Sequence, residues 1–166
     1  MKFFIAFAIG LVTVTVDGSM SAQELPGAFT PRNGFEGRSE GKGWLRLFLG
    51  RRRPFHVESH GYERLDGTLQ LDQTITSQGR RPHDRSFVIS QIGPNRYTGT
   101  LSDAAGPVTL QTDGNRLYLR YRAKGPFVVR QTLILSPDGR AIENFGRITF
   151  LGIPVGRLQE TIIRED

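Results

Sequence analysis

The sequence predicts an all-β fold, a single antiparallel up-and-down β-barrel of about eight to ten strands. Three observations favour it. Apolar and polar residues alternate over most of the chain, turn residues recur every 10 to 14 positions, and no window holds a period of 3.6 residues. Alternation is typical of half-buried strands, because successive side chains point to opposite faces. Many short strands at such spacing favour a closed barrel, which leaves no exposed sheet edge.

The clearest repeating unit is the hairpin from Asp113 to Gly139. In its first run, Leu117, Leu119 and Tyr121 alternate with arginines. Turn residues bound both runs, as expected for antiparallel strands. The same pattern recurs along the chain and predicts ten strands, over residues 44–49, 55–65, 68–76, 85–92, 96–101, 108–112, 116–122, 127–136, 141–150 and 155–163.

The N-terminal residues predict export. Lys2 precedes an apolar run from Phe3 to Val16, followed by small residues. This is the pattern of a secretory signal peptide, over residues 1–22, with cleavage after Ser21 or Ala22. No cysteine is present to carry a lipid anchor, so a periplasmic location is expected. Residues 23–34 contain prolines and no periodicity and predict an irregular lead-in, and 35–166 form the barrel domain.

Composition limits the chemistry. The chain has no cysteine, which excludes disulfides, thiol catalysis and thiolate metal sites. Its net charge is +6, and 19 of its 22 basic residues are arginine. A basic surface attracts anionic partners such as phospholipid headgroups, although the same charge also serves solubility alone. Dense outward arginine and threonine argue against a barrel that faces lipid.

Two motifs resemble catalytic or metal sites and fail on geometry. Residues 37–41 match G-x-S-x-G, but that nucleophile needs a strand-to-helix turn, whereas here a glycine-rich loop leads into a strand. His56, Glu58 and His60 share one strand face. Residues four apart in a strand are roughly 13 Å apart, too far for two histidines to bind one metal, so a solvated face is expected.

Polar residues at inward positions point to a cavity. Gln73, Gln131 and Asn144 each stand between apolar residues of the same parity. A buried amide needs a hydrogen-bond partner, which is either another internal group or the polar end of a bound ligand. The candidate cavity residues are Gln73, Tyr97, Leu117, Leu119, Tyr121, Gln131, Leu133 and Asn144.

A second candidate site lies on the surface. Outward aromatics lead into a run of arginines, a combination that suits an anionic interface. The patch comprises Trp44, Arg46, Phe48, Arg51, Arg52 and Arg53. Alternatively, the lead-in, with Phe29 and Phe35, folds over Trp44 and covers it.

With these residues laid out, the chain resembles the family named domain of unknown function 3833, over roughly residues 35–164. The resemblance rests on spaced motifs at 35–43, 66–72, 96–100 and 114–117, and on Asn144, Gly152 and Gly156. It implies an exported protein with a barrel of the lipocalin or calycin type and no established reaction. The sequence lacks two tryptophans expected near Phe87 and Thr132, and only Asn144 carries over as a site residue.

The leading hypothesis is an exported barrel that binds a small lipophilic molecule or a lipid and catalyses no reaction. The alternative is an envelope protein with a filled barrel whose outward arginines contact anionic surfaces. An enzyme ranks third, because no acid–base or nucleophile constellation is recognisable. Neither a cofactor, a metal nor nucleic acid is expected, and the protein is expected to be a monomer.

Overall fold

The computed structural model describes residues 27–165, and all ten predicted strands are present there. The predicted signal peptide, residues 1–22, and the first residues of the lead-in lie outside the described residues. The elements are α1 (Pro31–Phe35), β1 (Gly37–Leu47), β2 (Arg53–Glu63), β3 (Leu69–Ser77), β4 (His83–Gly93), β5 (Arg96–Leu101), β6 (Val108–Asp113), β7 (Arg116–Arg122), β8 (Phe127–Leu135), β9 (Ala141–Phe150) and β10 (Ile153–Glu165).

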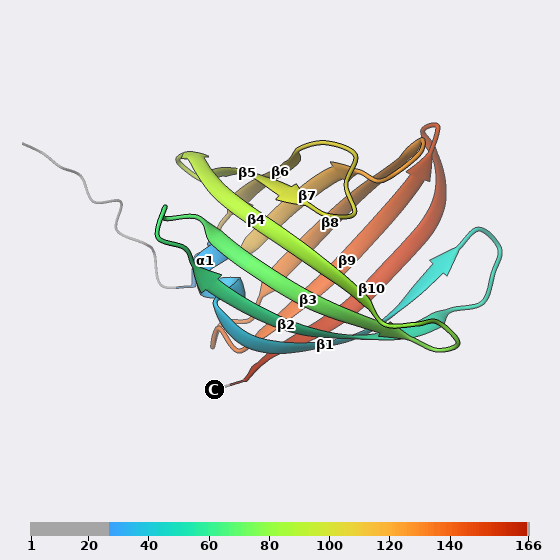
Figure 1. The fold of residues 1–166 in the computed structure, drawn as a ribbon, viewed down its shortest axis with the longest axis horizontal. Coiled ribbons are helices and arrows are strands. Elements are labelled where there is room, and N and C mark those ends of the chain that lie inside the picture. Colours follow the sequence, from blue (N-terminus) through green and yellow to red (C-terminus); the bar gives the residue numbers. More distant parts are fainter. Residues whose placement is uncertain (1–26, 166) are drawn as a thin grey trace, which may run out of the picture.

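The strands form one closed antiparallel barrel, which confirms the predicted fold class. Each strand pairs with its neighbour in sequence, and β1 closes the barrel by pairing with both β2 and β10. The first and last strands therefore lie side by side (Figure 1). Closure satisfies the backbone groups of β1 and β10, which would otherwise be free edges.

The alternation of the sequence becomes the inner and outer faces of the barrel. On β6, for example, Val108, Leu110 and Thr112 are buried, whereas the residues between them are exposed. Most of the buried apolar residues of β3 to β9 form one hydrophobic core cluster. That cluster includes Phe29 and Phe35, which precede the first strand.

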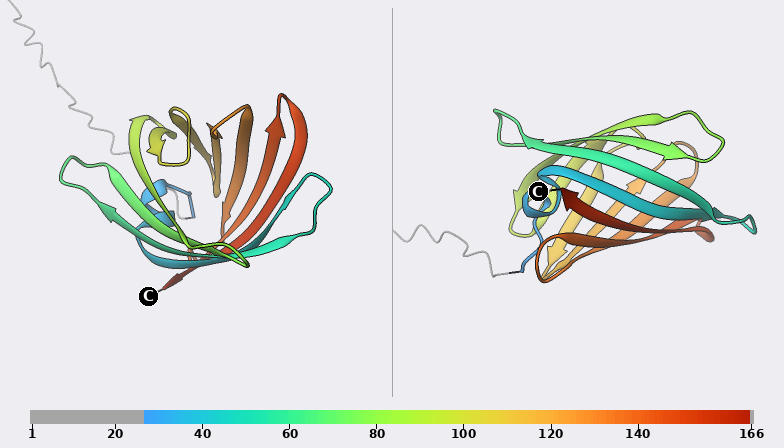
Figure 2. Two further views of the ribbon diagram at one scale, coloured as in Figure 1. Left: turned by 45° about the vertical axis from the view of Figure 1, so that its right-hand side comes forward. Right: turned by 90° about the horizontal axis from the view of Figure 1, so that it is seen from below.

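The short helix α1 closes one end of the barrel. Thr30 caps it through a reciprocal hydrogen-bonded pair with Asn33, and Pro31 occupies its first turn. The ring of Phe29 packs edge-on against Phe35, with 5.8 Å between ring centroids. Arg164 at the end of β10 donates to the carbonyl of Asn33, so the last strand ends beside the helix (Figure 2).

Two local expectations differ from the structure. The lead-in was expected to be irregular, yet its last residues enter α1, because a five-residue helix is too short to show periodicity and depends on its cap. Residues 37–41, expected in a glycine-rich loop, begin strand β1. Within residues 27–165, no helix is long and apolar enough to cross a membrane.

Candidate functional site: a cavity at the open end of the barrel

A cavity of about 480 Å³ lies inside the barrel at the end away from α1. Its volume is in the range of small-molecule sites, roughly 300–1,000 Å³. Most of its surface is apolar side chains from strands on both sides of the barrel. This apolar wall comprises Leu45, Phe55, Val57, Ile75, Val129, Ile148 and Leu158.

A layer of polar side chains separates the apolar wall from the hydrophobic core. On β8, the inward residues run from Val129 of the wall, through Gln131, to Leu133 of the core. β3 and β10 repeat this order of apolar, polar and apolar. The polar layer consists of Ser59, Gln73, Arg85, Tyr121, Gln131, Asn144 and Glu160, of which Arg85, Tyr121, Gln131 and Glu160 line the cavity.

One half of the polar layer is a hydrogen-bonded row across three strands. Arg85 donates through Nε and Nη2 to Oε1 of Gln73, at 2.9 and 2.7 Å. Gln73 in turn donates to Oγ of Ser59 at 3.0 Å. This row fixes the guanidinium of Arg85 at the cavity without neutralising it, because an amide oxygen carries no charge. A cation held in this way is a ready partner for an acidic group.

The other half is a buried carboxyl. Glu160 is 8% exposed, and Asn144 Nδ2 donates to its Oε2 at 2.9 Å. Burial raises the pKa of Glu160 above its usual value, while the hydrogen bond from Asn144 and the charge of Arg85 act in the opposite sense. Gly41 makes room for this side chain, since a Cβ there would lie 2.2 Å from Oε1 of Glu160.

Tyr121 completes the ionisable groups of the layer. Burial raises the pKa of its hydroxyl, and the charge of Arg85 partly offsets that effect. Arg85 therefore acts electrostatically on both Tyr121 and Glu160, from strands on either side of the cavity. The layer offers the cation of Arg85 and the amide of Gln131. It also offers Tyr121 and Glu160, whose raised pKa values keep them protonated to a higher pH than usual. This set of groups suits a carboxylate or phosphate.

Three arginines stand at the open end of the cavity. Arg51 comes from the β1–β2 connection, Arg53 begins β2, and Arg80 comes from the β3–β4 connection. All three are exposed. We call them the arginine mouth. Positive charge around an opening in a low-dielectric wall focuses the field and raises the local concentration of anions.

The structure divides the sequence-predicted cavity residues into two groups. Tyr121 and Gln131 line the cavity, and Gln73 and Asn144 lie beside it in the polar layer. Leu117, Leu119 and Leu133 do not form its wall. They belong to the core that Phe29 and Phe35 fill from the α1 end, and Tyr97 packs against that core. Alternation predicts which residues point inward, but not which end of the barrel is filled.

Sequence reasoning missed Arg85 and Glu160. The signal was present, since Arg85 shares the parity of Phe87 on β4, and Glu160 shares that of Leu158 on β10. Both stand within predicted strands, at positions where a charge is costly unless it is paired or functional. The barrel is thus filled at the α1 end and open at the other.

The predicted surface patch is split by the structure. Arg52 stacks on the ring of Trp44, with 4.1 Å from Cζ to the ring centroid. Arg51 and Arg53 belong to the arginine mouth, and Phe48 borders both the cavity and an outer groove. The lead-in does not cover Trp44, because its Phe29 and Phe35 are buried at the α1 end of the barrel.

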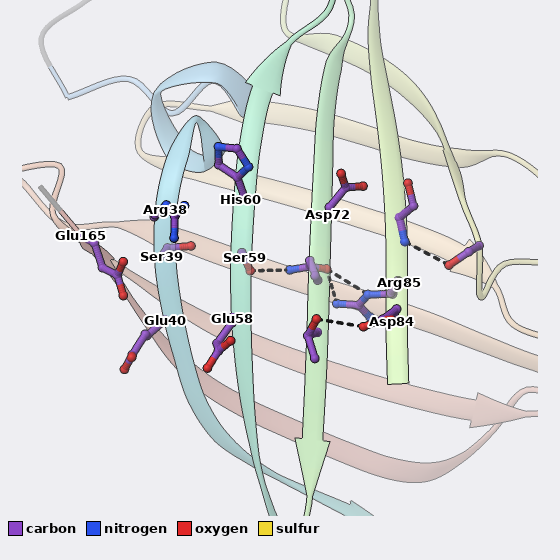
Figure 3. A pocket seen from close by; sticks show the side chains of 14 residues that line it. Arg38, Ser39, Glu40, Glu58, Ser59, His60, Asp72, Asp84, Arg85 and Glu165 are labelled. Atoms are coloured by element: carbon purple, nitrogen blue, oxygen red, sulfur yellow. Dashed lines mark hydrogen bonds between the residues drawn. The ribbon is translucent and has the colours of Figure 1, made fainter. Parts of the chain in front are cut away.

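A second, shallow hollow runs over the outer face of β1 to β4. Figure 3 shows its acidic side chains spread over five strands, and these are Glu40, Glu58, Asp72, Asp84 and Glu165. His60 lies near the end of the hollow, and His56 Nε2 is 3.7 Å from Glu40. Among the described residues, no group of three or more His, Cys, Asp or Glu side chains is close enough to hold a metal ion.

The sequence matches one family over almost its whole length. The model of this family, described as a protein of unknown function (DUF3833), matches residues 9–163. The chain belongs to this family. No curated protein matches it in sequence.

Solved structures share the barrel. An S-type phycobiliprotein lyase, CPES, from Guillardia theta is similar to 79% of this chain over 88% of its own length, with a TM-score of 0.63 and 8% identity. A redesigned β-barrel is similar to 80% of this chain over 92% of its own length, with a TM-score of 0.40 and 16% identity. At such identities the first similarity supports the barrel fold alone, and the second carries no weight.

Proposed function

We propose that this member of the DUF3833 family is an exported carrier that binds one small lipophilic molecule bearing an acidic group, such as a fatty acid or a lipid. The single observation that carries the proposal is the polar layer beneath the apolar wall, with Arg85 unneutralised at the cavity. The apolar body would lie along the wall, and the acidic end would meet Arg85, Gln131 and Tyr121.

The energetics favour a bound anion. Burying a hydrocarbon chain against the apolar wall is worth roughly 0.8 kcal/mol per CH₂ group. A hydrogen bond to a charged group is worth about 1.5–3 kcal/mol, more than a neutral one. Around the cavity, the four arginines outnumber the single carboxyl of Glu160, whose raised pKa favours its neutral form. The cavity therefore favours an acid over a neutral or cationic lipid.

The predicted compartment and the similar structure support a carrier. A signal peptide would deliver the protein to the periplasm, where lipophilic molecules need shielding from water. The similar solved structure, named as a phycobiliprotein lyase, shares the barrel fold in which we place the ligand. We infer binding without chemistry, because Glu160 and Tyr121 do not form a nucleophile–base pair.

The test is titration with a fluorescent long-chain fatty acid. The wild type is expected to bind one molecule per chain. Gln131→Leu should weaken binding roughly 10–100-fold, the value of one hydrogen bond to a charged group. Gln111→Leu, the same change at an exposed position on β6, is the control and should bind like the wild type.

A matched fatty alcohol tests the charge. The wild type should bind the acid more tightly than the alcohol, and Arg85→Met should remove most of that preference. Absence of saturable uptake by the wild type would refute the carrier. Equal affinity of Gln131→Leu and Gln111→Leu would show that the acidic end does not reach the polar layer.

A further inference from the structure

Two neighbouring hairpins expose large apolar side chains at the open end of the barrel. Phe48 and Leu49 lie in the β1–β2 connection, and Leu151 and Ile153 lie at the β9–β10 turn. Leu49 is completely exposed and Leu151 is 72% exposed. The backbone N–H of Phe48 donates to the carbonyl of Val155, so the two hairpins are joined. We call these four residues the apolar tips.

The backbone at both tips is strained. Phe48 has a φ of 52° and Leu151 a φ of 49°, in the left-handed region that glycine and asparagine adopt easily and bulky residues avoid. Stability alone would favour glycine or asparagine at these turns. Exposed apolar side chains kept at an energetic cost indicate a role outside folding.

Arginines form a straight row beside the tips. On β1, β10 and β9, Arg46 is paired directly opposite Arg157, which is paired opposite Arg147. The row continues through Arg130 on β8 to Arg120 on β7. Like charges directly opposite each other in a sheet repel. None of the five guanidinium groups forms an ion pair or hydrogen bond with another residue between positions 27 and 165.

A groove joins the arginine row to the tips. Its lining includes Arg46, Arg147 and Arg157 on one side, and Phe48 and Leu49 on the other. A surface that presents anionic groups above an apolar layer is complementary to both the arginine row and the apolar tips. Lipid phosphates would relieve the repulsion in the row, and the acyl region would bury the tips. A soluble polyanion would satisfy only the arginines.

We propose that the open end of the barrel docks on an anionic phospholipid bilayer, with the apolar tips inserted and the arginine row on the headgroups. The cavity then opens towards the membrane, which would supply or receive its ligand. This last point rests on the proposed carrier function. The docking itself does not, since the arginine row and three of the four tips lie outside the cavity, and only Phe48 borders both.

The test is co-sedimentation with vesicles of phosphatidylcholine, with or without phosphatidylglycerol, at about 0.15 M salt. The wild type should bind only the anionic vesicles. Arg147→Ser with Arg157→Ser should weaken binding about 30-fold, at roughly fivefold per arginine. Arg96→Ser with Arg116→Ser removes the same charge near the α1 end and should have little effect.

A second variant addresses the tips. Leu49→Ser with Leu151→Asn should weaken vesicle binding by on the order of 30-fold, because two leucines lose their apolar burial. The same variant should melt about 2–4 °C higher, because asparagine tolerates the backbone of position 151. Loss of binding with a gain in stability cannot arise from misfolding.

Three outcomes would overturn the docking proposal. The first is that the wild type does not bind anionic vesicles. The second is that the variant with Leu49→Ser and Leu151→Asn binds them as tightly as the wild type. The third is that the two double-arginine variants lose vesicle binding equally. Ile75→Trp, which fills the cavity from within, separates the two functions. It should abolish fatty-acid uptake and leave vesicle binding unchanged, so failure of the carrier and failure of docking are distinguishable.

Discussion

The buried carboxyl of Glu160 makes the stability of the barrel depend on pH. It is a carboxyl inside a barrel, held by Asn144 over a glycine that leaves it space. Because burial raises its pKa above 4.5, the folded protein keeps this proton at a pH where the unfolded chain has lost it. The folded state is therefore favoured at low pH, and this contribution is lost as pH rises from 4.5 through the raised pKa.

Replacing this carboxyl by an amide should remove that pH dependence. Glu160→Gln keeps an oxygen that accepts from Asn144 but has no proton to lose. We expect the stability of the variant relative to the wild type to increase as pH rises above 4.5, and then to level off. Urea unfolding at a series of pH values measures this. Glu58→Gln, on the exposed outer face, is the control, and identical pH profiles for Glu160→Gln and the wild type would contradict the account.

Single residues also show the limit of the sequence pattern. Alternation alone predicts that Gln73, Gln131 and Asn144 point inward, and they do. The same rule would have found Arg85 and Glu160. It could not show that these residues lie at one level of the barrel, because that level depends on the register between strands, and neighbouring strands are offset along the barrel.

At the scale of elements, α1 decides which end of the barrel is open. The helix fits closely over β2, where a Cβ on Gly61 would lie 1.8 Å from the carbonyl oxygen of Phe35. A backbone atom cannot move aside as a side chain can. The glycine is therefore what lets the helix pack against the strand and carry Phe29 and Phe35 into the core.

Gly61→Ala should displace α1 and lower the free energy of unfolding by about 1–3 kcal/mol, as overpacking does in a close-packed core. Gly93→Ala is the matched control, since a Cβ at position 93 meets no atom within 4 Å. Urea denaturation compares the two variants. Equal stability of Gly61→Ala and Gly93→Ala would show that the helix is not a fixed plug.

The strands and the helix differ in how well the sequence predicts them. Each strand carries its own alternation and turn residues, so its position follows from local pattern. The helix has five residues, and its position depends on the cap at Thr30 and on tertiary contacts of Phe29. Local pattern therefore could not show that the helix and its neighbouring phenylalanines fill one end of the barrel. That filling places Leu117, Leu119 and Leu133 in the hydrophobic core and not in the cavity wall.

The whole molecule is a barrel with two unlike ends. One end is closed by α1 and packed with apolar side chains, and the other holds a cavity bordered by arginines. Between them lies the polar layer, which a barrel built for stability alone would replace by apolar residues. A closed end, an open end that holds the cavity and exposed apolar tips around that opening together fit the proposed carrier that loads at a membrane.

The most direct test of the proposed carrier is native mass spectrometry of the protein purified without detergent from its native cells. The account predicts a mass shift of one bound molecule per chain, and extraction under denaturing conditions should release an acidic lipophilic compound. A mass equal to that of the bare chain, unchanged after incubation with fatty acids and anionic phospholipids, would contradict the account.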